Sequence, residues 1–492
     1  MTSPRYPSLY QINTRPWLAR RSRKLGRGAT LDDIPDAELD RIAGLGFDWA
    51  WFLSVWQTGP ASRQVSRTRP EWRRAFEAAL PGLTDDDIPG SGFAITAYEA
   101  HEALGGDEAL ARLRSRLHAR GLKLMLDFVP NHTALDHPWV EEHPEYYIGG
   151  TEEDLARAPR NYIKVRRRDG DGVFALGRDP YFDGWPDVLQ LDYGNPAVQE
   201  AMAGELLEIA GRCDGVRCDM AMLVLPEVFE RTWGIPSQPF WPDAIRRVRE
   251  QTQGFCFLAE VYWDYEWALQ QQGFDYAYDK RLYDRLRERH ARPVREHLRA
   301  EIDYQDRLAR FLENHDEPRA AATFPPGVHE AAALITYLSP GLRFLQEGQL
   351  QGRRVHIPPH LGREPDEPAD EQLERFYEKL LTLLRTSTLR EGRWRLLECS
   401  PAWEGNWTAD GFLAFAWQGP DGGRLLAVVN YADNQGQCHV HLPFEDLGGR
   451  TWRLKDRMGG PSYTRKGDEL RDRGLFVDLG PYGYHVFDMK EA

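Results

Sequence analysis

The feature that most constrains the fold of this chain is a set of apolar, strand-like segments that each end in an acidic residue. Apolar residues such as those at 122–126 and 255–258 run directly into these acids. A carboxylate at the end of a buried strand is costly unless a partner or a reaction uses it. Several such strand ends converge on one pocket in a parallel (β/α)8 barrel, where they build the active site. The acids are Asp127, Asp219, Glu260 and Asp316.

The spacing of these acids fits a barrel with one insertion. A (β/α)8 barrel gives about 31 residues to each strand–helix unit. The 41 residues from Asp219 to Glu260 fit one unit with a longer loop, and the 56 residues from Glu260 to Asp316 fit two short units. The 92 residues from Asp127 to Asp219 are too many for one unit. We therefore expect an inserted segment after the third strand.

Local patterns complete this organisation. Residues 8–12, 47–55 and 341–345 have the composition of the first, second and last barrel strands, and residues 36–45, 107–120 and 195–212 that of helices. Residues 57–98 are rich in Gly and Pro and are interpreted as a long loop. Short alternating runs begin near Arg393 and indicate an antiparallel domain. The predicted fold class is α/β: a (β/α)8 TIM barrel over 1–392, an inserted domain over 133–194 and a C-terminal β-sandwich over 393–492.

Composition narrows the class of protein and its location. The net charge of −14 gives no footprint for nucleic acid, and no stretch approaches the ~20 apolar residues of a membrane span. The number of cysteines, five, is odd, and they form no C-x-x-C pair, which favours reduced thiols. The N-terminal segment lacks the apolar run of a signal peptide. We expect a cytoplasmic enzyme with no nucleic-acid or membrane partner.

The four acid-ending segments resemble, in order, the signature regions of the alpha-amylase family, glycoside hydrolase family 13. In that family the third, fourth, fifth and seventh barrel strands end in D-x-x-x-N-H, G-x-R-x-D, a Glu and N-H-D. The matching residues here are 127–132, 215–219, 260 and 314–316. The resemblance covers at least residues 8–350, and a small domain after the third strand is a further family trait.

The resemblance implies a role for each of three acids. Asp219 is the expected nucleophile, Glu260 the acid/base, and Asp316 the third acid, which binds ring hydroxyls. The residues agree, because Arg217 lies two positions before Asp219 and so faces the same side of a strand, where a cation keeps the carboxylate ionised. The apolar surroundings of Glu260 favour a raised pKa, as a general acid requires. The alternative, a buried Arg217–Asp219 ion pair without chemistry, leaves the other motifs unexplained.

Further residues are expected to bind substrate or support the site. His132 and His315 match the family histidines that bond to the sugar in subsite −1. A histidine at a strand end is commonly structural, but two Asn-His pairs beside acids favour binding. The resemblance gives Asp127 a supporting role through hydrogen bonds. It aligns Phe93 with an aromatic residue that stacks under the sugar, and loop packing is the alternative for Phe93.

The sequence departs from the family after the fourth strand. Many members continue there with a Lys that contacts substrate and a His whose backbone ligates calcium, whereas this chain has Met222 and Leu223. We expect these two residues to make the leaving-group side of the pocket apolar. Asn131 and Asp192 remain as candidate calcium ligands, too few for an ion that prefers six to eight oxygens. We therefore expect no metal and no other cofactor, with the insert held by its aromatic residues.

The function implied by the resemblance is retaining hydrolysis of α-1,4-linked glucans or maltooligosaccharides through a covalent glycosyl-enzyme intermediate. A transglycosylase or isomerase of the same family, transferring glucosyl or maltosyl units, is the alternative, and water exclusion by Met222 and Leu223 would favour it. A non-catalytic barrel that serves as a scaffold is a third hypothesis. The persistence of all three acids argues against it.

Overall fold

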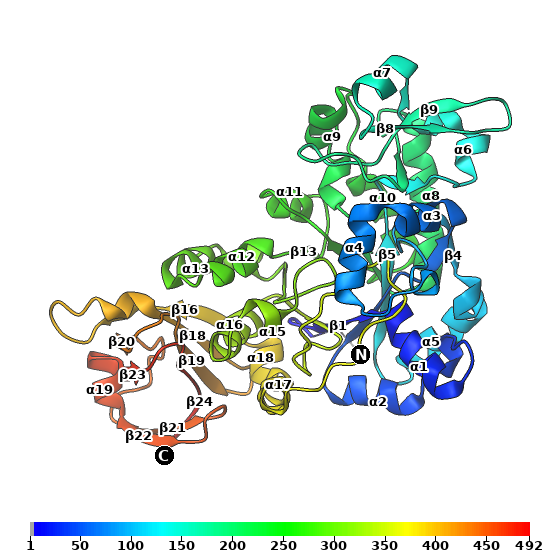
Figure 1. Cartoon of the computed structure of the whole chain (residues 1–492). Helices are drawn as coiled ribbons and strands as arrows, with labels where there is room; N and C mark the ends of the chain where they lie inside the picture. The colour runs from blue at the N-terminus through cyan, green and yellow to red at the C-terminus, as the bar shows by residue number, and fades with distance from the viewer. Residues whose placement is uncertain (1–3) are drawn as a thin grey trace.

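A closed barrel of parallel strands forms the centre of the computed structural model, which describes residues 4–492 (Figure 1). β1 pairs with both β2 and β15, so the sheet closes on itself. This confirms the predicted (β/α)8 fold. Residues 1–3, which begin the segment that lacks a signal-peptide pattern, lie outside the described residues. The barrel strands are β1 (Ser8–Asn13), β2 (Trp49–Leu53), β5 (Lys123–Phe128), β11 (Gly215–Cys218), β12 (Cys256–Ala259), β13 (Tyr276–Tyr278), β14 (Leu308–Arg310) and β15 (Leu342–Gln346).

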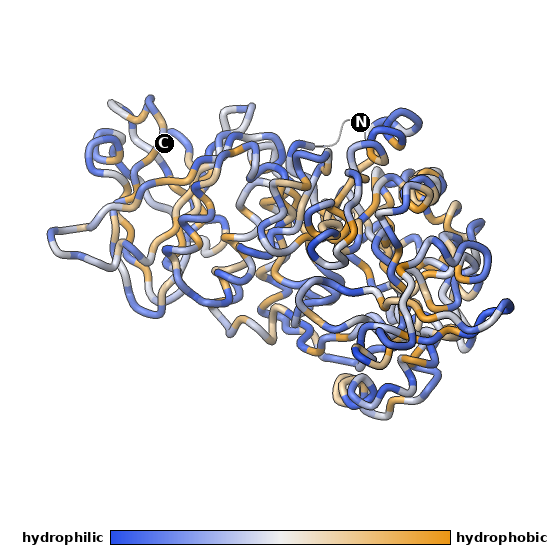
Figure 2. The backbone as a smooth tube through the Cα atoms, turned by 90° about the horizontal axis from the view of Figure 1, so that it is seen from above, coloured by the Kyte–Doolittle hydropathy of each residue, from blue (hydrophilic) through white to orange (hydrophobic). Residues whose placement is uncertain are grey.

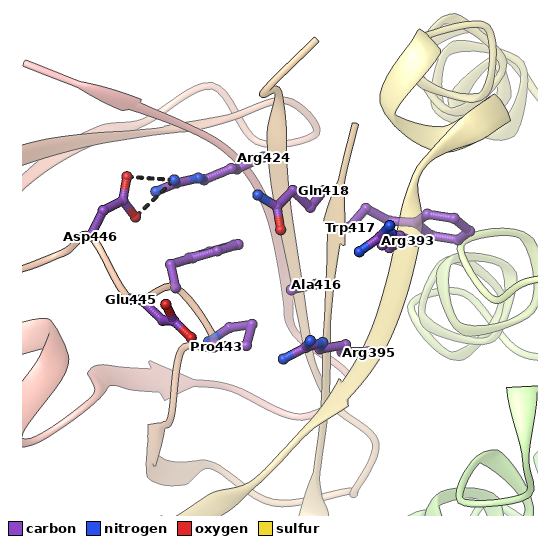
Figure 3. Close-up of a pocket in the computed structure, with 10 residues that line it drawn as sticks. Arg393, Arg395, Ala416, Trp417, Gln418, Arg424, Pro443, Glu445 and Asp446 are labelled. Carbon is purple, nitrogen blue, oxygen red and sulfur yellow. Dashed lines mark hydrogen bonds and ion pairs between the residues drawn. The ribbon is translucent and has the colours of Figure 1, made fainter. Parts of the chain in front are cut away.

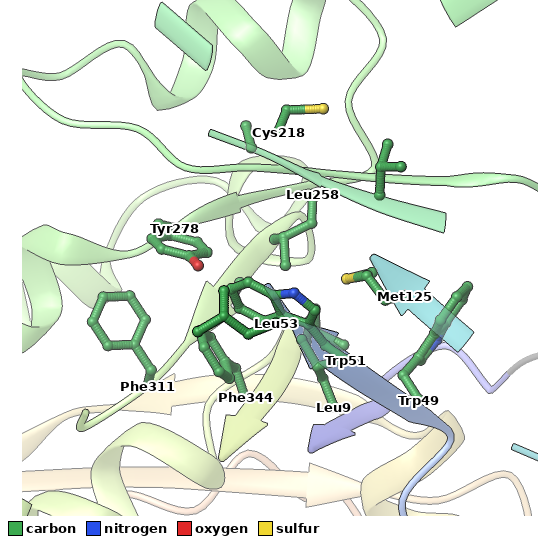
Figure 4. Close-up of a cluster of buried hydrophobic side chains, with 14 of the residues drawn as sticks. Leu9, Trp49, Trp51, Leu53, Met125, Cys218, Leu258, Tyr278, Phe311 and Phe344 are labelled. Carbon is green, nitrogen blue, oxygen red and sulfur yellow. The ribbon is translucent and has the colours of Figure 1, made fainter. Parts of the chain in front are cut away.

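Aromatic side chains fill the interior of the barrel (Figure 4). The ring of Phe344 lies 5.7 Å, between centroids, from the rings of both Trp51 and Tyr278. These three residues come from β15, β2 and β13, which are not neighbours in the sheet, so the contacts cross the barrel. Residues of β2 and β15 are buried throughout, as expected for parallel strands covered on both faces.

Helices surround the strands. Three predicted helices are present with ends within two residues of those expected, namely α2 (Asp36–Gly44), α5 (Gly106–His118) and α8 (Pro196–Arg212). The segment 57–98, expected to be a long loop, instead contains two helices and two short strands. These elements are β3 (Trp56–Thr58), α3 (Pro60–Thr68), α4 (Pro70–Ala79) and β4 (Ile95–Ala100). The other helices that cover the barrel include α1 (Thr14–Leu25), α9 (Pro226–Trp233), α10 (Trp241–Gln251), α11 (Glu266–Gln271), α12 (Lys280–Glu288), α13 (Ala291–Leu298), α16 (Val328–Tyr337), α17 (Glu371–Leu384) and α18 (Ser387–Glu391).

The segment after the third barrel strand forms small sheets above the barrel, at the top right of Figure 1. Tyr147 of this segment belongs to the barrel core, and Tyr146, Tyr162 and Trp185 pack against it. The expected packing of the insert through its aromatics is therefore present. Its elements are β6 (His132–Ala134), α6 (Trp139–Glu142), β7 (Gly149–Gly150), α7 (Glu152–Arg157), β8 (Tyr162–Val165), β9 (Gly172–Ala175) and β10 (Val188–Gln190).

The C-terminal part forms an antiparallel domain of two sheets with a core of its own, at the left of Figure 1. Trp417 joins it to the barrel, because its indole donates a hydrogen bond of 2.8 Å to the Leu338 carbonyl. The exact domain limits stay a prediction. One sheet contains β16 (Arg393–Leu397), β18 (Phe412–Gln418), β19 (Arg424–Asn430), β21 (Thr451–Asp456), β22 (Ser462–Lys466) and β24 (Tyr484–Glu491), and the other β17 (Cys399–Pro401), β20 (Gly436–Val440) and β23 (Leu475–Leu479).

A cavity of about 360 Å³ lies in this C-terminal domain (Figure 3). Its wall includes Arg424, which is paired with Asp446 and lies over the rings of Phe444 and Trp452. None of the acids singled out in the sequence lines it. Along the chain, hydrophobic stretches are short and alternate with hydrophilic ones (Figure 2). Within residues 4–492, no helix has the length and apolarity needed to cross a bilayer.

The entry into the last barrel strand depends on a glycine. Gly341 has φ of 111°, and a Cβ atom there would lie 2.2 Å from the Leu308 carbonyl oxygen of the neighbouring strand. Gly341→Ala should therefore destabilise the protein by at least about 1–3 kcal/mol. Urea denaturation followed by circular dichroism measures the change.

Gly204→Ala is the matched control. Gly204 lies inside α8, where an added Cβ atom would meet no neighbouring atom within 4 Å, so alanine should stabilise this helix by up to about 1 kcal/mol. Opposite shifts of the two midpoints are expected. An unchanged or raised midpoint for Gly341→Ala would refute the close approach of β14 and β15.

Candidate active site

The parallel barrel brings the predicted acids to one end. Asp219 and Glu260 directly follow β11 and β12, and Asp316 lies in the loop after β14. All three line a cavity of about 280 Å³, as the strand-end pattern predicts. The other residues that line the cavity are Trp72, Ser91, Phe93, His132, Trp185, Asp187, Val188, Met220, Tyr262, Pro359 and His360.

The guanidinium of Arg217 links the three acids. One terminal nitrogen lies 2.5 Å from Asp219 Oδ1, and the other lies 2.7 Å from Glu260 Oε2 and 3.8 Å from Asp316 Oδ2. Arg217 is fully buried, so its charge acts on these carboxyl groups with little solvent screening. The Arg217–Asp219 ion pair thus exists, but it is one arm of a larger cluster.

The rings of Trp51, Phe93 and Tyr278 surround the guanidinium of Arg217. Their centroids lie 5.2–5.9 Å from its central carbon, a distance at which a cation is attracted to an aromatic face. The hydroxyl of Tyr278 also accepts a hydrogen bond of 3.4 Å from Arg217 Nε. Arg217 is therefore fixed in place before any substrate binds.

Glu260 has the environment of a carboxyl group that keeps its proton. Burial raises its pKa, Arg217 opposes the rise, and the charges of Asp219 and Asp316 add to it. Tyr262 donates a hydrogen bond of 3.0 Å to Oε1, and the backbone N–H of Met220 donates one of 2.7 Å to Oε2. A carboxyl group of this kind can act as a general acid near neutral pH.

Asp127, for which the resemblance implies a supporting role, does not line the cavity. Its carboxyl group accepts hydrogen bonds from the Trp51 indole at 3.1 Å and from the Ser54 backbone at 3.0 Å. Burial raises the pKa of Asp127 to about 7, and the charge of Arg217 opposes the rise. These contacts support an indirect role, in which Asp127 positions Trp51 against Arg217.

The two histidines occupy different positions. His132 lines the cavity, and its ring lies 5.3 Å from that of Trp185; burial lowers the pKa of His132 to about 4, so it is neutral. Nδ1 of His315 accepts a hydrogen bond of 2.7 Å from the Gln11 amide, which leaves the proton on Nε2, 3.1 Å from Asp316. Phe93 lines the cavity and stacks on His315 at 5.3 Å, so it is part of the site.

The expectation for Met222 and Leu223 is wrong. Both lie in the turn Ala221–Val224, are at most 3% exposed and belong to the barrel core. The residue that reaches the cavity is Met220, whose φ of 42° turns the chain at the start of this turn. The turn therefore directs its apolar side chains inward, away from the cavity.

Several residues of the cavity escaped the sequence analysis. Trp72 lies in a segment taken as a loop, and Trp185, Asp187 and His360 lie among Pro-rich residues without a helix or strand period. The Trp-Pro-Asp order at 185–187 is typical of a turn and gives no signal for a residue of the cavity. Two of these residues are polar, namely Asp187, which is buried, and His360, which is half-buried.

The residues named as candidate calcium ligands do not fit a calcium site. The side chains of Asn131 and Gln190 pair through two hydrogen bonds, in which the Gln190 amide donates to Asn131 Oδ1 at 2.9 Å and the Asn131 amide donates to Gln190 Oε1 at 3.2 Å. Asp192 instead accepts a hydrogen bond of 2.9 Å from the Gly194 backbone. Asn131 Oδ1 thus accepts a hydrogen bond from within the chain and Asp192 belongs to a separate turn, so we derive no step through calcium.

The fold and the cavity together define a (β/α)8 barrel with a carboxyl-lined site at the carboxyl ends of its strands. The family model for the alpha-amylase catalytic domain matches residues 30–373. The chain belongs to the alpha-amylase family.

Sequence relatives carry several activities in their names. The chain is 28% identical over 312 residues to the alpha-amylase MalA of Haloarcula japonica, a match that covers 61% of this chain and 42% of the relative. It is 33% identical over 147 residues to an alpha-1,4-glucan:maltose-1-phosphate maltosyltransferase of Cereibacter sphaeroides, covering 28% of this chain and 22% of the relative. The matches therefore span less than half the length of these relatives.

Solved structures share the fold. The maltogenic alpha-amylase AmyB of Thermotoga neapolitana superposes with a TM-score of 0.70 at 18% identity, over 100% of both chains. The alpha-amylase of Geobacillus thermoleovorans, solved with acarbose, gives 0.67 at 19% identity, also over 100% of both chains. At these identities the likeness shows a common fold.

The Asn131–Gln190 pair generates a prediction about metal dependence. Because the barrel and the insert are joined here by paired amides, treatment with EGTA should leave both the melting temperature and the activity unchanged. A ligand present at 100 times its dissociation constant would add about 2.7 kcal/mol of stability, which shifts a melting curve visibly. A melting temperature that falls by several degrees and returns on addition of calcium would contradict this prediction.

Proposed function

We propose that this chain is a retaining α-glycosidase that acts on α-1,4-linked glucans or maltooligosaccharides through a covalent glycosyl-enzyme intermediate. The observation that carries the proposal is the sharing of one buried guanidinium, that of Arg217, by Asp219 and Glu260 beside a cavity. This sharing holds two carboxyl groups of different environment close together. Retaining glycosidases need such a pair, one as nucleophile and one as acid/base.

In the first step, Asp219 attacks the anomeric carbon while Glu260 gives its proton to the glycosidic oxygen. The carbon–oxygen bond breaks, the leaving sugar departs as an alcohol, and the glycosyl unit is an ester of Asp219. In the second step, the Glu260 carboxylate takes a proton from water, whose oxygen attacks the anomeric carbon and releases Asp219. Arg217 holds the Asp219 carboxyl group in place through their ion pair of 2.5 Å.

Asp316 and His315 are placed to hold the sugar. The Asp316 carboxylate lies in the cavity and is the most exposed of the three acids, with 38% of its side chain accessible. His315 lies 3.1 Å from it and is itself fixed by Gln11. We assign to Asp316 hydrogen bonds with ring hydroxyls that strengthen as the ring distorts toward the transition state.

Transfer to a sugar or phosphate acceptor is the second candidate function. It is favoured by the names of relatives, among them the maltosyltransferase and the trehalose synthase/amylase TreS of Mycobacterium tuberculosis, which is 28% identical over 202 residues. The chemistry of the first step is the same in both. Product analysis with maltose and maltoheptaose separates them, since hydrolysis releases new reducing ends and transfer redistributes chain lengths.

The roles of the two acids can be tested by isosteric changes. Asp219→Asn should lower kcat by about 10⁴-fold or more, because an amide does not attack the anomeric carbon. Glu260→Gln should lower kcat by about 10²–10⁴-fold on maltooligosaccharides and much less on aryl glycosides with good leaving groups. Melting curves control for folding. Activity of Asp219→Asn within tenfold of wild type would remove Asp219 as the nucleophile.

The stereochemistry gives an independent test. Two displacements at the anomeric carbon return its configuration, so the first product formed from an α-linked substrate should be the α-anomer. Proton NMR recorded before mutarotation detects it. A β-anomer as the first product would sink the two-step mechanism while leaving the family assignment intact.

The pH profile should reflect the protonated state of Glu260. Because its pKa is raised, the acid is active below that pKa, and kcat/KM falls as pH rises through it. Tyr262→Phe removes a hydrogen bond that favours the ionised carboxylate, so the alkaline limb should move to higher pH. Tyr265→Phe is the control, since no hydrogen bond joins its hydroxyl to Glu260 in the described residues. Identical profiles for both variants would exclude this role of Tyr262.

A further inference from the structure

The cavity has a second polar wall that the proposed reaction does not use. Asp187 and His360 line it together with Trp72, and they come from the insert and from the loop after β15. Both form hydrogen bonds with serines of α3, the first helix after β2. We define the far wall as Asp187, His360 and Trp72.

Asp187 is a buried carboxyl group with too few hydrogen-bond donors. It is 4% exposed, forms no ion pair with any described residue, and accepts a hydrogen bond of 3.2 Å from the Ser62 hydroxyl. Burial raises its pKa to about 6, and its own backbone, Ser62 and the distant charge of Arg69 oppose the rise. A carboxylate in this position is stabilised by any further donor that enters the cavity.

His360 presents an acceptor to the same cavity. We assign the Ser66 hydroxyl proton to the Ser62 carbonyl, 3.0 Å away, so that Ser66 accepts a hydrogen bond of 2.9 Å from His360 Nδ1. Burial lowers the pKa of His360 to about 4, so the ring is neutral and Nε2 carries a lone pair. No described residue donates to Nε2. The far wall therefore offers a carboxylate and an imidazole nitrogen, and both accept hydrogen bonds.

The far wall is built into rigid parts of the fold. Ser62 and Ser66 are four residues apart on α3 and therefore lie on the same face of the helix. Both side chains are fully buried from solvent. The first turn of α3 is capped by Asp136 of the insert, which accepts a hydrogen bond of 2.9 Å from the Ala61 backbone. The wall is thus formed before substrate arrives.

The loop after β15 is fixed to α4 by a hydrophobic cluster separate from the barrel core. Phe76 of α4 and Leu80, the residue that follows this helix, pack there with Ile357 and Leu361 of the loop. Rings of Trp72 and Phe76 lie 4.5 and 5.6 Å from that of His360. His360 therefore has little freedom to turn away from the cavity.

The order of the barrel strands places the far wall opposite the acid. The strand β1 is flanked by β2, which leads into α3 and α4, and by β15, which leads into the loop with His360. The strand β12, which leads into Glu260, lies across the barrel from β1. A general acid stands on the side of the leaving group, whose oxygen it protonates. The far wall therefore faces the other side, where the glycosyl unit that remains on the enzyme extends toward its non-reducing end.

We propose that Asp187 and His360 accept hydrogen bonds from hydroxyl groups of the sugar at the non-reducing end of the substrate, so that the cavity binds a chain end. This inference rests on the proposed glycosidase or transferase function and deepens it. The enzyme would remove or transfer a terminal unit instead of cleaving within a long chain. A sugar hydroxyl donated to an otherwise under-partnered carboxylate gives a charge-assisted hydrogen bond.

The first test compares two aryl maltoheptaosides that differ only at the non-reducing end, one free and one with its terminal 4- and 6-hydroxyls blocked as an ethylidene acetal. The wild type should release the aryl group or shorten the free substrate, with kcat/KM for the blocked one lower by at least about 100-fold. Equal rates on both would overturn the proposal and leave the proposed function standing. No turnover of either, nor of an aryl α-glucoside, would instead remove the proposed function.

The second test substitutes residues of the far wall and leaves Asp219, Glu260 and Asp316 unchanged. Asp187→Asn and His360→Phe should each raise KM for free-ended maltooligosaccharides by about 10- to 100-fold, the loss of one good hydrogen bond, with a much smaller change in kcat. They should also lower the ratio of kcat/KM for the free substrate to kcat/KM for the blocked substrate. Asp179→Asn is the matched control. Asp179 is a buried aspartate of the same insert, accepts hydrogen bonds from the backbone N–H groups of Tyr181 and Phe182, and does not line the cavity.

Melting curves distinguish a binding defect from a folding defect. If Asp187→Asn proves unstable, His360→Phe still tests the far wall, because phenylalanine keeps the ring packing on Trp72. A wild-type KM and an unchanged end preference in a folded variant at either position would overturn the role of that residue. If both variants behave like Asp179→Asn, the far wall does not bind the chain end.

Discussion

The buried charge of Arg217 is the interaction on which the rest of the site depends. Three carboxyl groups converge on one cavity, and among residues 4–492 Arg217 is the arginine or lysine that pairs with them. Without that cation, repulsion from the other two carboxylates would raise the pKa of Glu260 further. Burying such a cluster contributes little to stability and can lower it, because desolvation offsets the attraction between the charges. The cluster is better explained by the reaction we propose than by folding.

The barrel makes this cluster possible through its register. On β11, Arg217 lies beside Asp127 of β5 on one flank and beside Leu258 of β12 on the other. Asp127 in turn binds Trp51, whose ring faces the guanidinium. Neighbouring strands therefore contribute side chains around the charge, and the residues that follow the strands contribute the acids. A shift of register in one strand would turn these side chains to the opposite face.

Residues whose function is tied to the end of a strand could be predicted from the sequence, because an apolar run and a terminal acid lie within a few positions of each other. The far wall could not, since Asp187 and His360 are 173 positions apart and each lacks a local period. Residues 57–98 were misjudged for a related reason. The Gly and Pro content there predicts a loop, whereas Pro60 and Pro70 each occupy the first position of a helix, where a missing N–H costs nothing. The direction of the turn after β11 depends on the backbone angle φ of Met220, which cannot be predicted from the pattern of side chains in the sequence.

The cap that Asp136 of the insert places on α3 has an evolutionary consequence. It joins the insert to the second barrel loop, and α4 joins that loop to the one after β15. These three segments, namely the insert, the loop that contains α3 and α4 and the loop after β15, form one unit outside the barrel, whereas the reacting groups directly follow the barrel strands. Insertions and deletions in these segments can therefore lengthen, open or close the cavity without moving a strand. Related chains can diverge in the size of molecule they accept while the chemistry at Arg217 stays the same.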